Sequence, residues 1–127
     1  MSQQVDGNTK GFTASEAIPR YARVKTTGAG TVGVAGLTDK DLGTAQNDAF
    51  AAGDPVTVKL RSAAGTHKVI ASEALAAGAT LYTEASGKVQ DTAQATAFIW
   101  GQALEAATAD GDVIEAVVNT HGDTAAS

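Results

Sequence analysis

The chain has 127 residues, no cysteine and a formal net charge of −5. A chain of this length is typical of one domain that can bury enough surface to fold unaided. The lack of cysteine excludes disulfide bonds, a thiolate nucleophile and a cysteine-based zinc site. No stretch approaches the ~20 apolar residues of a membrane helix and no apolar leader opens the chain, so we expect a soluble protein with no membrane partner and no export signal.

Charge is spread unevenly along the chain. Residues 1–25 contain four basic and two acidic residues, whereas after Lys88 there are six acidic residues and no Lys or Arg. Direct binding of nucleic acid needs cations that face phosphates, so the acidic balance argues against it. The N-terminal part is predicted to meet an acidic partner, and the acidic remainder is predicted to face solvent.

Residues 1–17 are polar and show no apolar periodicity, which predicts a flexible N-terminal arm. A frayed terminus and a binding arm both fit this pattern. Proline lacks the N–H group that a central strand needs, so the first strand is expected after Pro19. From Arg20 to Gly28 polar and apolar residues alternate, as they do in a half-buried strand.

Two short motifs follow, and each can be interpreted either as a binding motif or as an ordinary turn or loop. Gly28–Gly33 matches the letters of the dinucleotide-binding fingerprint, but that motif needs a helix to begin there. The chain instead continues with another glycine and no helical periodicity, which favours a hairpin turn into residues 31–35. Asp39 and Asp41 are spaced as in a calcium loop, but the other ligands are missing, which favours a solvated loop.

One short motif occurs three times: small residues, then a glycine, then an apolar residue three positions after that glycine. Its glycines are Gly53, Gly78 and Gly111. Glycine adopts positive φ without a steric penalty, so each of them is predicted to turn the chain just before a strand. The spacings between these glycines differ, so the pattern does not indicate a regular solenoid.

Further strands are predicted from alternating or apolar stretches. Residues 55–71 are expected to form a β-hairpin with its loop at 62–66, and residues 80–90 a second hairpin with its loop at 85–87. With the strand after Pro19, these elements indicate an all-β domain.

Two later stretches complete the predicted sheet. Residues 98–104 are the most hydrophobic part of the chain and are a predicted central strand. Residues 113–118 are almost continuously apolar, which predicts a last strand that is buried on both faces. Seven or eight strands are expected in total, with single helical turns at residues 46–52 and 72–77 at most.

No cluster of residues suggests a reaction centre. His67 and His121 have no serine or carboxylate at a spacing typical of a relay and are predicted to lie at the surface. Asp110 and Asp112 flank a turn glycine, where carboxylates commonly cap the turn. Trp100 is predicted to lie in the core. We therefore expect no catalytic residue, no metal and no cofactor, and we predict that the protein is not an enzyme.

Three stretches, taken together and in order, carry a family resemblance. Residues 76–82 read Ala-Ala-Gly-Ala-Thr-Leu-Tyr, residues 86–89 read Ser-Gly-Lys-Val, and residues 101–115 read Gly-Gln-Ala-Leu-Glu-Ala-Ala-Thr-Ala-Asp-Gly-Asp-Val-Ile-Glu. They resemble the small decoration, or cement, proteins of tailed-bacteriophage capsids. The resemblance covers residues 20–119.

This resemblance implies a fold and a function. The expected fold is a small β-barrel or β-sandwich over residues 18–119, with an extended N-terminal arm over residues 1–17 and a polar tail over residues 120–127. The expected function is non-enzymatic: the protein binds the outer surface of an assembled capsid and stabilises it. The resemblance further implies a homotrimer at three-fold positions that bridges copies of the major capsid protein. It would be made in the bacterial cytoplasm and would end on the virion surface.

The residues expected to contact the capsid are the polar, basic and apolar side chains of the N-terminal part. They are Gln3, Val5, Lys10, Phe12, Arg20 and Arg23. Two alternatives stay open: a phage surface fibre or carbohydrate-binding module, and a nucleotide-binding domain that uses Gly28–Gly33.

Overall fold

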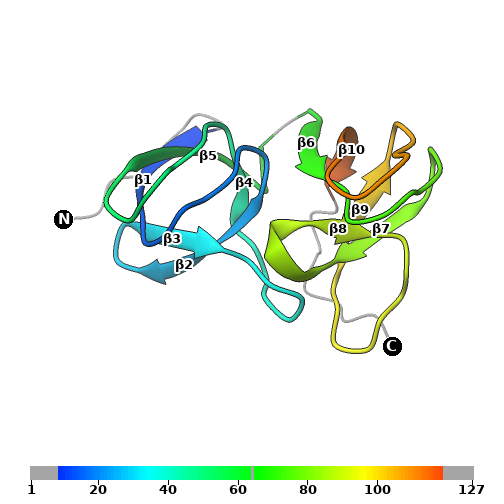
Figure 1. Ribbon diagram of the computed structural model, residues 1–127, viewed down its shortest axis with the longest axis horizontal. Helices are drawn as coiled ribbons and strands as arrows, with labels where there is room; N and C mark the ends of the chain where they lie inside the picture. The colour runs from blue at the N-terminus through cyan, green and yellow to red at the C-terminus, as the bar shows by residue number, and fades with distance from the viewer. Residues whose placement is uncertain (1–8, 64, 119–127) are drawn as a thin grey trace.

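Two five-stranded sheets follow one another along the chain and lie side by side in the computed structural model (Figure 1). The structure describes residues 9–63 and 65–118. The first sheet is a closed barrel with the strand order β1-β3-β2-β4-β5, here called barrel 1. The second, called sheet 2, has the order β6-β10-β9-β7-β8. The prediction of an all-β fold with a small barrel is therefore confirmed.

The strands are short, and most are separated by tight turns. Barrel 1 contains β1 (Thr9–Ala14), β2 (Arg23–Gly28), β3 (Thr31–Val34), β4 (Gly43–Ala45) and β5 (Pro55–Leu60). Sheet 2 contains β6 (His67–Ile70), β7 (Thr80–Thr83), β8 (Val89–Gln90), β9 (Ile99–Ala103) and β10 (Val113–Val118). The helical structure of the described residues is one 3₁₀ turn, η1 (Ala85–Gly87), between β7 and β8.

The two halves repeat one pattern. Residues 14–18 read Ala-Ser-Glu-Ala-Ile, and residues 71–75 read Ala-Ser-Glu-Ala-Leu. Ile18 forms an isolated bridge to Ala49, and Leu75 forms the corresponding bridge to Ala107. β1 pairs in parallel with β3, and a parallel bridge between Ala71 and Val89 joins the equivalent positions of sheet 2. The chain is thus an internal duplication, which the prediction of one domain did not include.

Equivalent glycines support the duplication at the level of packing. A Cβ atom on Gly43 of β4 would overlap the carbonyl oxygen of Lys59, and one on Gly101 of β9 would overlap that of Val117. Both glycines therefore allow the neighbouring strand to approach at the same place in each half.

Each half has its own small core. In barrel 1, valines and alanines from all five strands pack around Ile18. In sheet 2, Trp100 is fully buried among valine, leucine and alanine side chains, as predicted. Separate cores of this size leave little apolar burial to spare, so contacts between the halves matter for stability.

The three repeated glycines occupy tight turns. The φ angles are +95° at Gly53, +89° at Gly78 and +97° at Gly111. In each turn the N–H group after the glycine donates to the carbonyl two residues before it, at 3.2 Å, 3.2 Å and 3.3 Å respectively. Positive φ at the third position of a hydrogen-bonded turn is where glycine is preferred. Tyr21 holds the equivalent place to Gly78 in barrel 1, with φ +70°.

The predicted arm does not extend over residues 9–14, because these residues form β1. β1 runs antiparallel to β5 from Thr9, which pairs with Lys59, to Thr13, which pairs with Pro55. Its outer face carries threonine and glycine, so the stretch has too few apolar residues to show the alternation of a strand. The sequence therefore predicted a polar arm here. Residues 1–8 and 119–127 lie outside the described residues, and with them the whole predicted C-terminal tail, residues 120–127.

The predicted hairpin over residues 55–71 is wrong. β5 pairs with β1 and β4, whereas β6 pairs with β10, so residues 61–66 connect the two halves. Each strand finds its partner within its own half of the duplication, which a local turn signal cannot reveal. The second predicted hairpin is confirmed as β7 and β8, and the turn after Gly28 is confirmed between β2 and β3.

The last two predicted strands are present, but one prediction about burial is wrong. β9 lies between β7 and β10, as expected for a central strand. β10 alternates, since Ile114, Ala116 and Val118 are buried while Val113 is 46% and Val117 is 44% exposed. An antiparallel sheet can keep one face in solvent, and the outer face of β10 does so.

Replacement of a turn glycine by valine is expected to destabilise the protein. A Cβ atom on Gly53, Gly78 or Gly111 would meet open space, so the cost arises from the positive φ angle alone. We expect a loss of about 1–3 kcal/mol in the free energy of unfolding for each variant, measured by denaturant unfolding. The matched control is Gly11→Val, because Gly11 also has open space but lacks a positive φ. Equal losses for the control and the turn variants would contradict this account.

Candidate docking surface

Arg23 was predicted to contact the capsid, but the structure places it in the interior between the two halves. Its side chain is 0% exposed. The Nε atom donates to the Lys88 carbonyl at 2.9 Å, and Nη2 donates to the carbonyls of Gly36, at 3.1 Å, and Glu84. A side chain without exposed surface is not part of a docking face, so Arg23 has a structural role that joins barrel 1 to sheet 2.

Asp41 is the counterion of this junction, and the prediction that it lies in a solvated loop is wrong. Its Oδ1 atom lies 3.5 Å from Nη1 of Arg23 and 2.9 Å from Nη1 of Arg61. Its Oδ2 atom accepts a hydrogen bond of 3.2 Å from Nε1 of Trp100. Burial lowers the pKa of Arg23, and the Asp41 carboxylate opposes that lowering. A single carboxylate therefore binds three donors that come from both halves.

His67 was predicted to lie at the surface and is instead buried at the same junction, 2% exposed. Its Nε2 atom donates to the Leu60 carbonyl at 3.1 Å, and its ring meets Trp100 edge-on with 6.5 Å between centroids. Its Nδ1 atom is buried and has no hydrogen-bond partner among the described residues. Burial lowers the pKa of His67, so the ring is neutral at pH 7. His121 lies outside the described residues.

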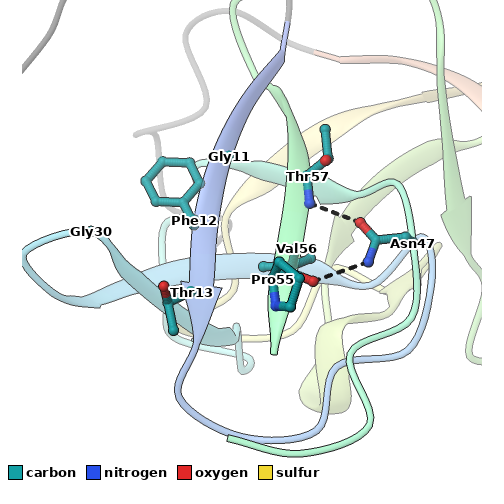
Figure 2. Close-up of a pocket in the computed structure, with 8 residues that line it drawn as sticks. All are labelled: Gly11, Phe12, Thr13, Gly30, Asn47, Pro55, Val56 and Thr57. Carbon is teal, nitrogen blue, oxygen red and sulfur yellow. Dashed lines mark hydrogen bonds between the residues drawn. The ribbon is translucent and has the colours of Figure 1, made fainter. Parts of the chain in front are cut away.

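A groove lies on the outer face of barrel 1, between β1 and β5 (Figure 2). Its volume is about 560 Å³. Gly11 pairs with Thr57 across the two strands, and a Cβ atom on Gly11 would meet nothing within 4 Å. The lining residues are Gly11, Phe12, Thr13, Gly30, Asn47, Pro55, Val56 and Thr57. The missing side chain at Gly11 therefore leaves the groove open.

Phe12 and Asn47 stand on opposite sides of this groove (Figure 2). Asn47 is held by two hydrogen bonds to β5: Nδ2 donates to the Pro55 carbonyl at 3.2 Å, and Oδ1 accepts from the Thr57 N–H at 2.8 Å. The Phe12 ring is partly buried against the core of barrel 1. Both walls are thus fixed before any partner binds.

Phe50 is the most exposed large apolar side chain of the described residues, at 82%. It opens the turn that precedes β5. The Oδ2 atom of Asp54 accepts the N–H groups of Phe50, at 2.9 Å, and Ala51, at 3.2 Å. The Gly53 N–H donates to the Ala14 carbonyl at 2.8 Å. The backbone of this turn is therefore held firmly, and it presents an aromatic ring to solvent.

Basic side chains gather on barrel 1. Lys10 Nζ lies 5.9 Å from the centre of the Phe12 ring, and the Arg20 guanidinium carbon lies 4.6 Å from the centre of the Tyr21 ring. Lys68 of β6 reaches the same Tyr21 ring at 5.8 Å. Of the predicted contact residues, Lys10, Phe12 and Arg20 thus lie on barrel 1 with exposed or partly exposed side chains, whereas Gln3 and Val5 lie outside the described residues.

The duplication separates the charges. Residues 9–63 contain seven basic and five acidic residues, a formal net charge of +2. Residues 65–118 contain two basic and seven acidic residues, a formal net charge of −5. Barrel 1 and sheet 2 therefore present surfaces of opposite net charge.

Two further features are absent from the described part of the chain. No group of three or more His, Cys, Asp or Glu side chains in residues 9–63 and 65–118 is arranged to hold a metal ion. Within the same ranges, no helix is long and apolar enough to cross a membrane.

The fold and these exposed features define an all-β protein whose first half carries an open groove, an exposed phenylalanine and basic side chains. Residues 5–119 match the family model described as phage cement protein, and the chain belongs to this family. The resemblance seen in the sequence is confirmed. No curated protein matches the chain.

A solved structure shows the same fold. It is the N base of the head fibre protein gp8.5 of bacteriophage phi29, with a TM-score of 0.71 and 20% sequence identity. The superposition covers 87% of this chain and 92% of that chain. The two-sheet arrangement is therefore found in at least one other phage head protein.

Asp41→Asn is expected to destabilise the protein strongly, because it leaves two guanidinium groups without their counterion. Loss of one partner of a buried ion pair costs about 3–5 kcal/mol, which denaturant unfolding at pH 7 would measure. Lys25→Met is the control, since the Lys25–Asp39 pair is 38% and 30% exposed and its loss should cost under about 1 kcal/mol. Similar losses for the two variants would show that the junction is not a stabilising contact.

The buried His67 is expected to make stability fall in mild acid. Its folded-state pKa lies below the ordinary value of 6.5, so the unfolded chain takes up a proton first as the pH falls. The free energy of unfolding should therefore decline below about pH 6.5, by at most about 1.4 kcal/mol per pH unit for one proton, until the folded-state pKa is reached. Thermal or denaturant unfolding between pH 7.5 and 5 of the wild type and His67→Gln would test this. Parallel curves for the two proteins would refute it.

Proposed function

We propose that this protein is a non-enzymatic cement protein that binds the outer surface of an assembled phage capsid and stabilises it. The family match over residues 5–119 carries this proposal, because it identifies the chain as a structural protein of the phage capsid. The finer proposal is a homotrimer at three-fold positions, where it bridges neighbouring major capsid subunits on the virion surface.

Barrel 1 faces the capsid in this proposal, and sheet 2 faces outward. The net charge of +2 on residues 9–63 and of −5 on residues 65–118 supports this orientation, because complementary charge steers and orients a bound protein. Lys10 and Arg20 supply basic contacts from barrel 1. Gln3 and Val5, which precede β1, extend the contact along the shell.

Avidity makes a trimer effective on a shell. One barrel offers a small contact area, and small interfaces bind weakly. Once one of three linked copies is bound, the others bind at a high effective concentration, so avidity can exceed single-site affinity by ~10²–10⁴. An assembled shell presents three matching sites together, whereas a free subunit presents one.

A second candidate is the base of a surface fibre. The fold likeness to the head fibre protein of bacteriophage phi29 favours it. A fibre base also binds the capsid, but it must carry a further segment outward, so the two functions differ in what lies beyond sheet 2 on the particle. Microscopy of decorated particles would separate a compact cap from a projecting fibre.

The capsid proposal is tested by co-sedimentation with assembled capsids that lack the protein. We expect the wild type to sediment with capsids but not with free capsid subunits, and reconstruction to show it at three-fold positions. The double variant Lys10→Glu/Arg20→Glu should bind more weakly, most clearly at low salt, because screening weakens surface charge contacts. Lys88→Glu on sheet 2 is the control and should bind like the wild type.

Deletion of residues 2–8 separates binding from folding. The deletion leaves all five strands of barrel 1 in place, because β1 begins at Thr9, so the midpoint of thermal unfolding should hardly change. Capsid occupancy should fall, since Gln3 and Val5 are lost. If the deletion variant occupies capsids as fully as the wild type, residues 2–8 do not anchor the protein. If the wild type itself does not sediment with assembled capsids, the proposed function is overturned.

A further inference from the structure

The duplication supplies an internal comparison for the groove and the exposed ring of barrel 1. In sheet 2 the position of Phe50 is taken by Thr108. Asp112 Oδ2 accepts the N–H groups of Thr108, at 2.8 Å, and Ala109, at 3.2 Å, just as Asp54 does in barrel 1. The same turn therefore forms without an aromatic residue, so its geometry does not explain Phe50.

The strand pair that forms the groove has a counterpart in sheet 2 that carries long side chains. Gly11 pairs with Thr57 in barrel 1, and in sheet 2 the equivalent pair is Lys68 and Glu115. The wall is built alike as well, because Glu105 Oε1 accepts the Glu115 N–H at 2.7 Å where Asn47 accepts that of Thr57. On one backbone design, barrel 1 thus has an open hollow and sheet 2 has two long charged side chains.

The exposed ring and the glycine that leaves the groove open therefore occur together on one half, whereas the other half has Thr108 and Lys68 at the equivalent positions. Neither is needed for the fold, since sheet 2 folds in the same way without them. A solvent-exposed phenylalanine costs solubility and is the kind of side chain that anchors protein interfaces. The pairing of a protruding ring with a hollow on the same half indicates two complementary parts of one contact.

We propose that Phe50 of one copy inserts into the groove of a second copy, and that this contact holds the oligomer together. The inference rests on the trimer in the proposed function and names its interface. Within one chain the ring does not fill the groove, because Phe50 is 82% exposed and is not among the residues that line it.

The chemistry of the groove suits an aromatic ring. Its volume of about 560 Å³ lies within the ~300–1,000 Å³ typical of binding sites. The exposed Pro55 offers apolar contact, and the partly exposed Phe12 ring offers an aromatic partner, which adds to burial when two rings meet edge-on or offset. The open backbone at Gly11 allows the ring to approach closely.

The geometry of the contact agrees with a closed ring of copies. The protruding ring and the groove are different surfaces, so each copy gives one of each, and in the proposed trimer the contact repeats head to tail as a heterologous contact. Three copies arranged in a ring use every phenylalanine and every groove. This arrangement leaves Lys10 and Arg20 to the capsid.

Two single variants test the contact from its two sides, with molar mass measured by light scattering over a concentration series. Phe50→Ser removes the ring, and Gly11→Val fills the groove where a Cβ has open space and a β-branched residue suits a strand. We expect both to keep the circular dichroism spectrum of the folded wild type and to weaken self-association by at least about 30-fold, the size of an aromatic hot spot. Leu104→Ser, which alters a 45% exposed side chain of sheet 2, should associate like the wild type.

Mixing the two variants gives a complementation test. A Gly11→Val chain keeps its ring and a Phe50→Ser chain keeps its groove, so a mixture can form one intact contact per pair. We expect a one-to-one dimer in the mixture at concentrations where each variant alone is monomeric. A mixture that stays monomeric would count against the contact.

Other outcomes identify other partners. A wild type that is monomeric throughout the series, or variants with wild-type mass, would overturn the inference. If Phe50→Ser keeps its mass but loses capsid binding, the ring docks on the capsid and not on a second copy, which also overturns it. Capsid sedimentation of the wild type, measured in parallel, reports on the proposed function independently of these masses.

Discussion

The Asp41 carboxylate is the contact on which the arrangement of the two halves depends. It binds Arg23 from barrel 1, Arg61 from the segment that connects the halves, and the indole N–H of Trp100 from the core of sheet 2. Arg23 in turn donates to the carbonyl groups of Glu84 and Lys88. Buried charges of this kind need nearly all their partners, because an unpaired one costs several kcal/mol. The junction therefore selects one orientation of the halves, whereas an apolar contact would tolerate several.

The duplication explains how so small a chain combines a rigid scaffold with a specialised surface. Turns, bridges and closely approaching glycines are the same in both halves, because backbone hydrogen bonds and the φ angles at the turns restrict what can replace them. Outward-facing side chains carry no such restriction. Phe50 and Gly11 on one half, and Thr108 and Lys68 on the other, differ at positions where the fold accepts either residue.

The divergence also separates charge, and this suits a protein that coats a shell. A basic-leaning half and an acidic half give the molecule a direction, so that approach to a charged surface favours one end. The hydrogen bonds and ion pairs of the junction join the two ends directly. In the proposed capsid complex, a link of this kind would orient sheet 2 relative to barrel 1, which a flexible linker would not do.

Much of this protein could be predicted from the sequence alone. Local signals in the sequence are the alternation of polar and apolar residues, turn glycines and short motifs in a particular order. These signals predicted the all-β class, the turn at Gly28, the β7–β8 hairpin, the central strand with Trp100 and the family membership. Such signals involve only a few neighbouring residues, so they can be recognised without knowledge of the fold.

Only the tertiary structure decided which polar residues are buried and where the docking features lie. Arg23 is 65 residues from Lys88, and Asp41 is 59 residues from Trp100, so no local pattern marks them as partners. His67 resembled a surface residue for the same reason. β1 was not predicted as a strand because its outer face is polar. Phe50 and Gly11 were recognised as unusual only when they were compared with the equivalent residues of the second half, Thr108 and Lys68. Burial and surface shape arise from contacts between segments that are distant in the chain, and the sequence does not state which distant segments meet.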